Sequence, residues 1–94
     1  MPIQSFRHKA LKRLFEESDA RGLPAGQTQK LLDVLAALDT AEEPNEVGLF
    51  PGWRLHPLKG ARKGFWSVTI TGNWRVIFRF DKGDVFDVDF IDYH

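Results

Sequence analysis

Two groups of residues in this sequence combine side chains that carry acid–base chemistry. His56 lies in the run RLHPLKG, and the sequence closes on Asp92, Tyr93 and His94. Imidazole titrates near neutrality, so a histidine can donate or accept a proton at cellular pH. If the last strand lies beside the strand that carries His56, two imidazoles, a phenol and a carboxylate converge. Taken singly, a histidine is more often a plain surface residue, and a terminal tripeptide is often frayed.

Positive charge is clustered along the chain even though the formal net charge is zero. Residues 54–79 contain six basic side chains and no acidic one, whereas residues 14–53 contain two basic and eight acidic ones. Such clustering is typical of a site for a polyanion, although a solvated surface patch is the simpler alternative. The six basic residues are Arg54, Lys59, Arg62, Lys63, Arg75 and Arg79.

Other chemistries find no support in the sequence. Cysteine is absent, and the three histidines lack the HExxH spacing of a zinc site, so we expect no metal and no cofactor. There is no glycine-rich phosphate loop and no GxSxG motif. Charges from Arg7 onward interrupt any signal peptide, and no apolar run is long enough to span a bilayer, so we expect a cytoplasmic protein without a membrane partner. The length fits a single domain over residues 1–94.

The first half of the chain predicts helices. Apolar residues recur at helical spacing from about Lys9, and this helix should end at Gly22, which readily takes a left-handed conformation. A second helix should begin at Pro24 and run to about Asp39, with Leu31, Val34, Leu35 and Leu38 on one face. Residues 2–6 are expected to form a short edge strand, and the segment 41–52 is expected to be a loop.

The second half predicts four short strands, at residues 53–58, 65–71, 74–80 and 85–91. Gly72-Asn73 and Lys82-Gly83 mark two hairpins, and three-residue loops with a bulge sort the side chains into two faces. The apolar face would carry Trp66, Val68, Ile70, Val76, Phe78, Phe80, Phe86, Val88 and Phe90. The polar face would carry Ser67, Thr69, Thr71, Arg75, Arg79, Asp87 and Asp89. The expected fold class is therefore α+β, with two N-terminal helices packed on one face of a small antiparallel sheet.

With these elements in place, the chain resembles the HigB branch of the RelE/ParE toxin superfamily, the plasmid maintenance killer proteins. The resemblance lies in RLHPLKG, in GFWSVTITGNWRVIFRF, in the terminal DVDFIDYH and in the opening IQSFRHKALKRLFE. It covers nearly the whole chain, and the family fold agrees with the α+β prediction. One departure is Thr71-Gly72, where family members can carry a basic residue just before the NWR turn.

The resemblance implies a type II toxin that acts as a ribosome-dependent endoribonuclease and cleaves messenger RNA in the decoding site. It also implies a cognate antitoxin with a helix-turn-helix fold, through which alone the toxin would meet operator DNA. The active-site elements of the family fall on His56, Lys59, Arg75, Asp92, Tyr93 and His94.

Cleavage by metal-independent attack of the 2′-hydroxyl then assigns a role to each residue. Arg75 and Lys59 would hold the phosphate. His56 and His94 would transfer protons, with base and acid undecided between them. Asp92 would orient an imidazole or favour its protonated form, and Tyr93 would stack on a base or bond the phosphate. The remaining basic residues, Arg54, Arg62, Lys63 and Arg79, would contact RNA of the ribosome or the message.

Two other functions fit the same scaffold. One is a gyrase poison of the ParE type, which traps a topoisomerase and cuts no RNA, and which has no need of the histidine pair. The other is an RNA-binding module that uses the basic face without catalysis. Comparing RNA integrity with and without translating ribosomes separates the three.

Overall fold

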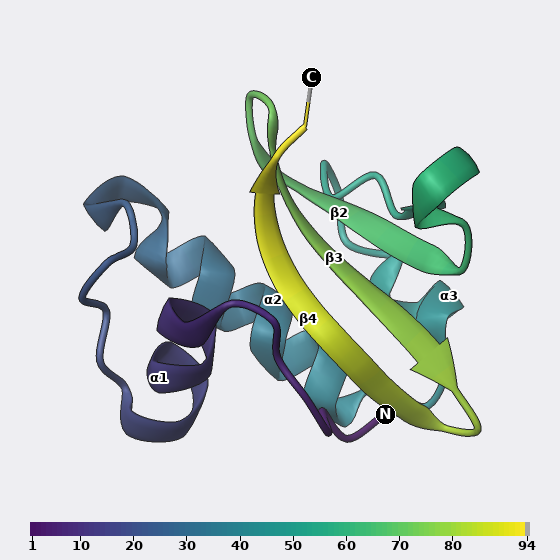
Figure 1. Ribbon diagram of the computed structural model, residues 1–94, viewed down its shortest axis with the longest axis horizontal. Coiled ribbons are helices and arrows are strands. Elements are labelled where there is room, and N and C mark those ends of the chain that lie inside the picture. The colour runs from purple at the N-terminus through teal and green to yellow at the C-terminus, as the bar shows by residue number, and fades with distance from the viewer. Residues whose placement is uncertain (94) are drawn as a thin grey trace.

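The computed structural model describes residues 1–93, in which helices cover one face of a four-stranded antiparallel sheet (Figure 1). This arrangement confirms the predicted α+β class. None of the described helices is long and apolar enough to cross a membrane. The elements in chain order are α1 (Lys9–Glu17), the 3₁₀ helix η1 (Ala25–Gln27), α2 (Thr28–Thr40), α3 (Pro44–Val47), β1 (His56–Pro57), the 3₁₀ helix η2 (Gly60–Arg62), β2 (Phe65–Thr71), β3 (Trp74–Asp81) and β4 (Asp84–Asp92).

The core lies between the helices and the sheet. Helix α2 buries one stripe at helical spacing, Leu31, Val34, Leu35 and Leu38, which confirms the predicted face. Each buried aliphatic side chain of this size contributes about 1.5–3 kcal/mol to folding. The sheet residues that meet the helices are Val68, Ile70, Val76, Phe78, Val85, Val88 and Phe90, with Trp66, Trp74 and Phe80 packed partly buried against them.

The connection between the first two helices is longer than the sequence predicted. Helix α1 ends at Glu17, because Ser18 takes the left-handed conformation (φ 55°) and its N–H donates to the carbonyls of Arg13 and Leu14. Gly22, the predicted end, lies in the loop with φ 84°. The predicted start at Pro24 is also wrong, because η1 intervenes and α2 begins at Thr28.

Two further expectations for the middle of the chain need correction. The predicted loop 41–52 contains α3, which starts at Pro44 and buries Val47 against the core. The predicted strand 53–58 is reduced to His56–Pro57, because Arg54 has a positive φ of 51° and breaks the extended run. Even so, the Trp53 carbonyl accepts the N–H of Thr69 at 2.7 Å, so the segment stays beside β2.

The register of β2 and β3 agrees with the prediction, since Val68 pairs with Val76 and Thr69 with Arg75. The β3–β4 pair differs. Asp81 pairs with Asp84 across a two-residue loop, and Arg79 consequently pairs with Phe86. Phe86 therefore faces outward, contrary to the prediction.

A β-bulge in β4 then restores the expected alternation. Asp87 has φ 55°, and the register shifts so that Ile77 pairs with Asp89. Two residues of β4 thus oppose one of β3, and Val88 points to the core.

Strands β1 and β4 lie at opposite edges of the sheet, because the order is β1-β2-β3-β4. The condition set for the convergence of the two groups, that the last strand lies beside the strand of His56, is therefore not met. The outer edge of β4 is covered instead by the N-terminal segment, which Figure 1 shows running alongside it. Ile3 and Phe6 form isolated parallel bridges to Val85 and Val88, and these two bridges take the place of the expected strand 2–6.

The end of α1 provides a test of this geometry. We expect S18G to raise the free energy of unfolding by about 0.5–1 kcal/mol, because glycine takes the left-handed conformation without steric strain. The control K12G, at an exposed position in the middle of α1, should lower the free energy of unfolding by about the same amount. Urea unfolding followed by tryptophan fluorescence measures both. A helix that continues to Gly22 would instead be destabilised by S18G.

Candidate functional site

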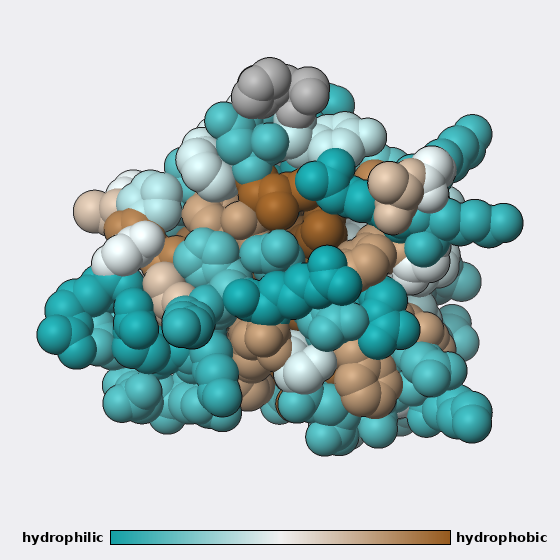
Figure 2. Space-filling view, in the orientation of Figure 1, coloured by the Kyte–Doolittle hydropathy of each residue, from teal (hydrophilic) through white to brown (hydrophobic). Residues whose placement is uncertain are grey.

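The face of the sheet opposite the helices is polar at its margins and apolar at its centre. Besides the predicted polar residues, this face carries a second hydrophobic cluster. In it Leu58, Phe65 and Ile77 are buried, and Ile91 packs against them. Figure 2 shows apolar atoms at the centre of this side of the molecule, with hydrophilic atoms around them. The expectation of a wholly polar face is thus wrong. Ile77 and Ile91 are apolar residues at strand positions expected to face outward, and they are the signal in the sequence that indicated an apolar centre.

Three segments converge at one end of this face. The N–H of Tyr93 donates to the carbonyl of Asn73 at 2.8 Å, which ties the end of β4 to the β2–β3 turn. The guanidinium of Arg62, from η2, lies 5.7 Å from the centroid of the Tyr93 ring. Arg75 is held against the same turn, because its Nη1 donates to the Gly72 carbonyl at 2.6 Å and to that of Trp74 at 3.1 Å. Two guanidinium groups and a phenol thus surround the turn.

His56 lies on the same face but on the far edge strand. It pairs with Ser67 across β1 and β2, and its side chain is exposed. The His56 Nδ1 lies 2.9 Å from the carbonyl oxygen of Arg54. Because a carbonyl only accepts, a hydrogen bond here requires the proton on Nδ1, and in that tautomer Nε2 is the acceptor. Between His56 and β3, the hydroxyl of Ser67 is buried without a hydrogen-bond partner among the described residues.

The other predicted basic residues divide into two groups. Arg54 is exposed just before β1. Lys59 and Lys63 are exposed at the two ends of η2, which carries Arg62 toward Tyr93. Arg79, by contrast, donates from Nε to Asp87 at 2.8 Å and lies 5.7 Å from the Phe86 ring. Its charge is therefore largely neutralised within the protein.

One cation on this face was missed by the sequence analysis. The guanidinium of Arg7 lies 5.0 Å from the Phe65 ring and 3.9 Å from the Asp87 carboxylate. The signal that pointed to it is the run of four basic and no acidic residues in positions 1–13.

The C-terminal residues are only partly placed. Asp92 is exposed and pairs with Trp74 across β3 and β4. The Trp74 ring stacks on that of Phe90 on the helix side of the sheet, with ring centroids 4.7 Å apart. The pairing therefore places the Cβ of Asp92 on the helix side as well. Arg75 and Tyr93 therefore share a face that Asp92 does not. His94 lies outside the described residues. Within residues 1–93 no group of three or more His, Asp or Glu side chains is arranged to hold a metal ion.

Comparison with known proteins identifies the family. A family model described as the RelE-like toxin of type II toxin-antitoxin system HigB matches residues 4–94. The chain belongs to this family. A HigB relative from Proteus vulgaris, named Endoribonuclease HigB, is 46% identical over 92 residues, which is 98% of this chain and 99% of that protein. Toxin HigB-1 of Vibrio cholerae serotype O1 is 29% identical over 79 residues and 83% of each chain.

The fold also agrees with that of a solved structure. A crystal structure of a YafQ mutant from E. coli matches with a TM-score of 0.52 and 16% identity, over 90% of this chain and 87% of that one. At this identity the similarity concerns the fold alone.

Membership in a type II toxin-antitoxin family implies a protein antitoxin as partner.

The contrast between Arg62 and Arg79 can be measured. We expect R62A to weaken binding of a single-stranded RNA oligonucleotide and to reduce the salt slope of binding by about 0.7–1, because one phosphate contact is lost. R79A should change the slope less, because Asp87 already compensates this cation. Fluorescence anisotropy at several salt concentrations gives both slopes. Equal losses in the two variants would contradict the assignment.

Proposed function

We propose that this chain is a ribosome-dependent endoribonuclease that cleaves messenger RNA in the decoding site by metal-independent attack of the 2′-hydroxyl. The observation that carries the proposal is the convergence of Arg62, Arg75 and Tyr93 on the sheet face left open by the helices. The 46% identity to Endoribonuclease HigB over nearly the full length of both chains supports the same activity. The toxin would act as one domain, residues 1–94, on cytoplasmic ribosomes.

Arg75 is suited to hold the scissile phosphate. Its hydrogen bonds to the β2–β3 turn fix the guanidinium before substrate arrives, so little side-chain entropy is lost on binding. Charge that develops on the phosphorane is then met by a preorganised donor. Lys59, exposed at the start of η2, would add a second positive charge from the other side of the face.

The proton transfers fall to the two histidines. The 2′-hydroxyl gives up its proton to a base and attacks phosphorus, and the 5′-oxygen takes a proton from an acid as the P–O5′ bond breaks. His56 offers Nε2 as an acceptor, since its Nδ1 is engaged by the Arg54 carbonyl. His94 would supply the second imidazole, and Asp92 would orient it or favour its protonated form. The products would be a 2′,3′-cyclic phosphate and a 5′-hydroxyl.

Tyr93 would hold a nucleobase next to the reacting phosphate. Its ring is 42% exposed, with Arg62 against it, and an exposed aromatic ring is a common platform for a splayed base. Ile91, two residues earlier on the same face, continues the apolar floor beside it.

The openness of this face is the reason to invoke the ribosome. The candidate residues come from β1, β3, η2 and the end of β4, and His56 and Tyr93 lie at opposite edges of the sheet. A substrate bound there alone is poorly aligned, and alignment can account for about 7–11 kcal/mol of the barrier. Arg54, Arg62 and Lys63 would contact ribosomal RNA, with Arg79 contributing less. A helix-turn-helix antitoxin would silence the toxin and supply all contact with operator DNA.

Ribosome dependence is tested directly with purified components. We expect little cleavage of naked messenger and rapid cleavage of the same messenger on programmed ribosomes. The fragments should carry 2′,3′-cyclic phosphate ends, and a single 2′-deoxy nucleotide at the cleaved position should block the reaction, because the attacking group is missing. Fragments ending in a 3′-hydroxyl, or equal turnover of both substrates, would refute the proposal. Intact messenger together with gyrase-dependent plasmid breaks would favour the gyrase poison.

Arg75 provides the sharpest test of the site. R75A should lower the single-turnover cleavage rate on the ribosome by about 10²–10³, the usual loss for one electrostatic contact to the transition state. R75K keeps a charge but loses the planar fork, so we expect an intermediate rate. Thermal unfolding should change little in either variant, since the lost bonds are to an exposed turn. Full cleavage by folded R75A would remove Arg75 from the mechanism.

A further inference from the structure

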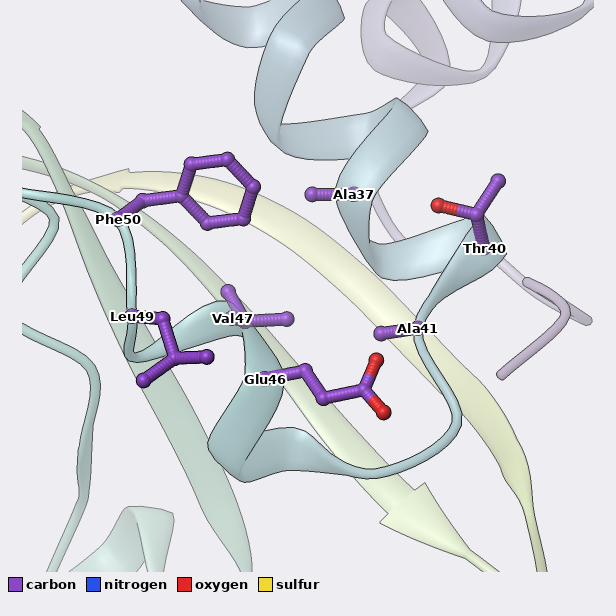
Figure 3. A pocket seen from close by; sticks show the side chains of 7 residues that line it. All are labelled: Ala37, Thr40, Ala41, Glu46, Val47, Leu49 and Phe50. Atoms are coloured by element: carbon purple, nitrogen blue, oxygen red, sulfur yellow. The ribbon is translucent and has the colours of Figure 1, made fainter.

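An exposed apolar groove lies on the helical side of the molecule, between α2 and the segment that follows α3. Leu49 is 81% exposed and Phe50 is 45% exposed, which is unusual for large apolar side chains. A hollow of about 380 Å³ lies beneath them, lined by Ala37, Thr40, Ala41, Glu46, Val47, Leu49 and Phe50. Figure 3 shows these side chains around the space between the two helices. None of these residues belongs to the proposed active site.

The groove continues along α2. A second hollow, of about 550 Å³, shares Ala37, Thr40 and Phe50 with the first and adds Asp33, Ala36 and Trp53. The Phe50 ring stacks on that of Trp53 with centroids 4.2 Å apart. Phe50 is thus held in place as a wall between the two hollows, and Leu49 is left projecting at the rim.

The surroundings of the groove are acidic. Residues 31–53 contain five carboxylates and no basic side chain: Asp33, Asp39, Glu42, Glu43 and Glu46. Asp33 and Glu46 line the two hollows, and neither forms an ion pair with any residue in positions 1–93. A segment that fills this groove must therefore present apolar anchors flanked by Lys or Arg.

We propose that this groove is the docking site for the antitoxin, through a segment with apolar anchors and flanking basic residues. Family membership implies such a protein partner, and the charge of the groove decides between occupants. A second copy docked through the same groove would bring Asp33 and Glu46 close to the same carboxylates of its partner, which is repulsive. RNA would be repelled for the same reason. The apolar anchors would fill the hollow beside Val47 and Ala37, in contact with Leu49 and Phe50 at its rim.

The test uses the purified cognate antitoxin, identified as the protein whose co-expression relieves growth arrest. L49S should weaken its binding about tenfold, and L49S combined with F50S should weaken it about a hundredfold, because the most exposed apolar contacts are lost. Because Leu49 is largely solvated, L49S should leave the melting temperature unchanged, so that variant remains informative even if F50S disturbs the stacking on Trp53. Calorimetric titration gives the dissociation constants.

A charge control separates the acidic rim from a general effect of charge. E46Q should weaken antitoxin binding several-fold and reduce its salt dependence, whereas E16Q, an exposed carboxylate on α1, should change neither. RNA cleavage by L49S on programmed ribosomes should equal that of the unmodified toxin. The titration does not depend on cleavage, so a failure of the proposed function would leave the docking result interpretable.

Two results would overturn the proposal. Antitoxin binding that is unaffected by L49S, by the double variant and by E46Q would place the antitoxin elsewhere. A toxin dimer that dissociates on L49S substitution, measured by sedimentation equilibrium, would show that a second copy occupies the groove.

Discussion

The placement of the C-terminal residues depends on the bulge at Asp87. Without this bulge, the register set by the two-residue turn at Lys82-Gly83 would continue unchanged to the end of β4. The side chains of Val88 and Phe90 would then point to the solvent face of the sheet. Several contacts hold the bulge: Ser5 Oγ accepts the Asp87 N–H at 2.9 Å, and the carboxylate meets Arg79 and Arg7. The N-terminal segment thus helps to determine the face on which Tyr93 emerges.

The same contacts set the electrostatics of the open sheet face. Asp87 compensates the cations near the β3–β4 turn. At the opposite end, Arg75 donates to two backbone carbonyls and Arg62 lies against the Tyr93 ring, and no ion pair of either is seen within residues 1–93. Positive charge available to a phosphate is therefore concentrated around the β2–β3 turn. The centre between the two ends, formed around Ile77 and Phe65, is apolar. In the proposed function it would offer nucleobases a surface that a purely polar face would lack.

The zero net charge conceals two surfaces of opposite sign. Residues 54–79 supply the basic one and residues 31–53 the acidic one, and the sheet separates them. In the functions proposed for this chain, RNA would bind one side and a basic protein segment the other, without competing for the same charges. The distribution of charge along the sequence is thus informative about this protein, whereas the net charge is not.

The sequence alone determined the elements whose pattern is local: the apolar stripe of α2, the three long strands, the β2–β3 register and the residues of the family motif. It did not determine the end of α1, because a serine took the left-handed position that glycine usually occupies, nor α3, which is stabilised by burial of Val47 rather than by propensity. It could not place His56 relative to Tyr93, since strand order is set by contacts between distant segments. The two-residue turn at Lys82-Gly83 directs Phe86 outward, and the bulge at Asp87 returns Val88 and Phe90 to the core. This bulge is held by Ser5, and no local pattern in β4 encodes a contact with a residue so far away in the chain.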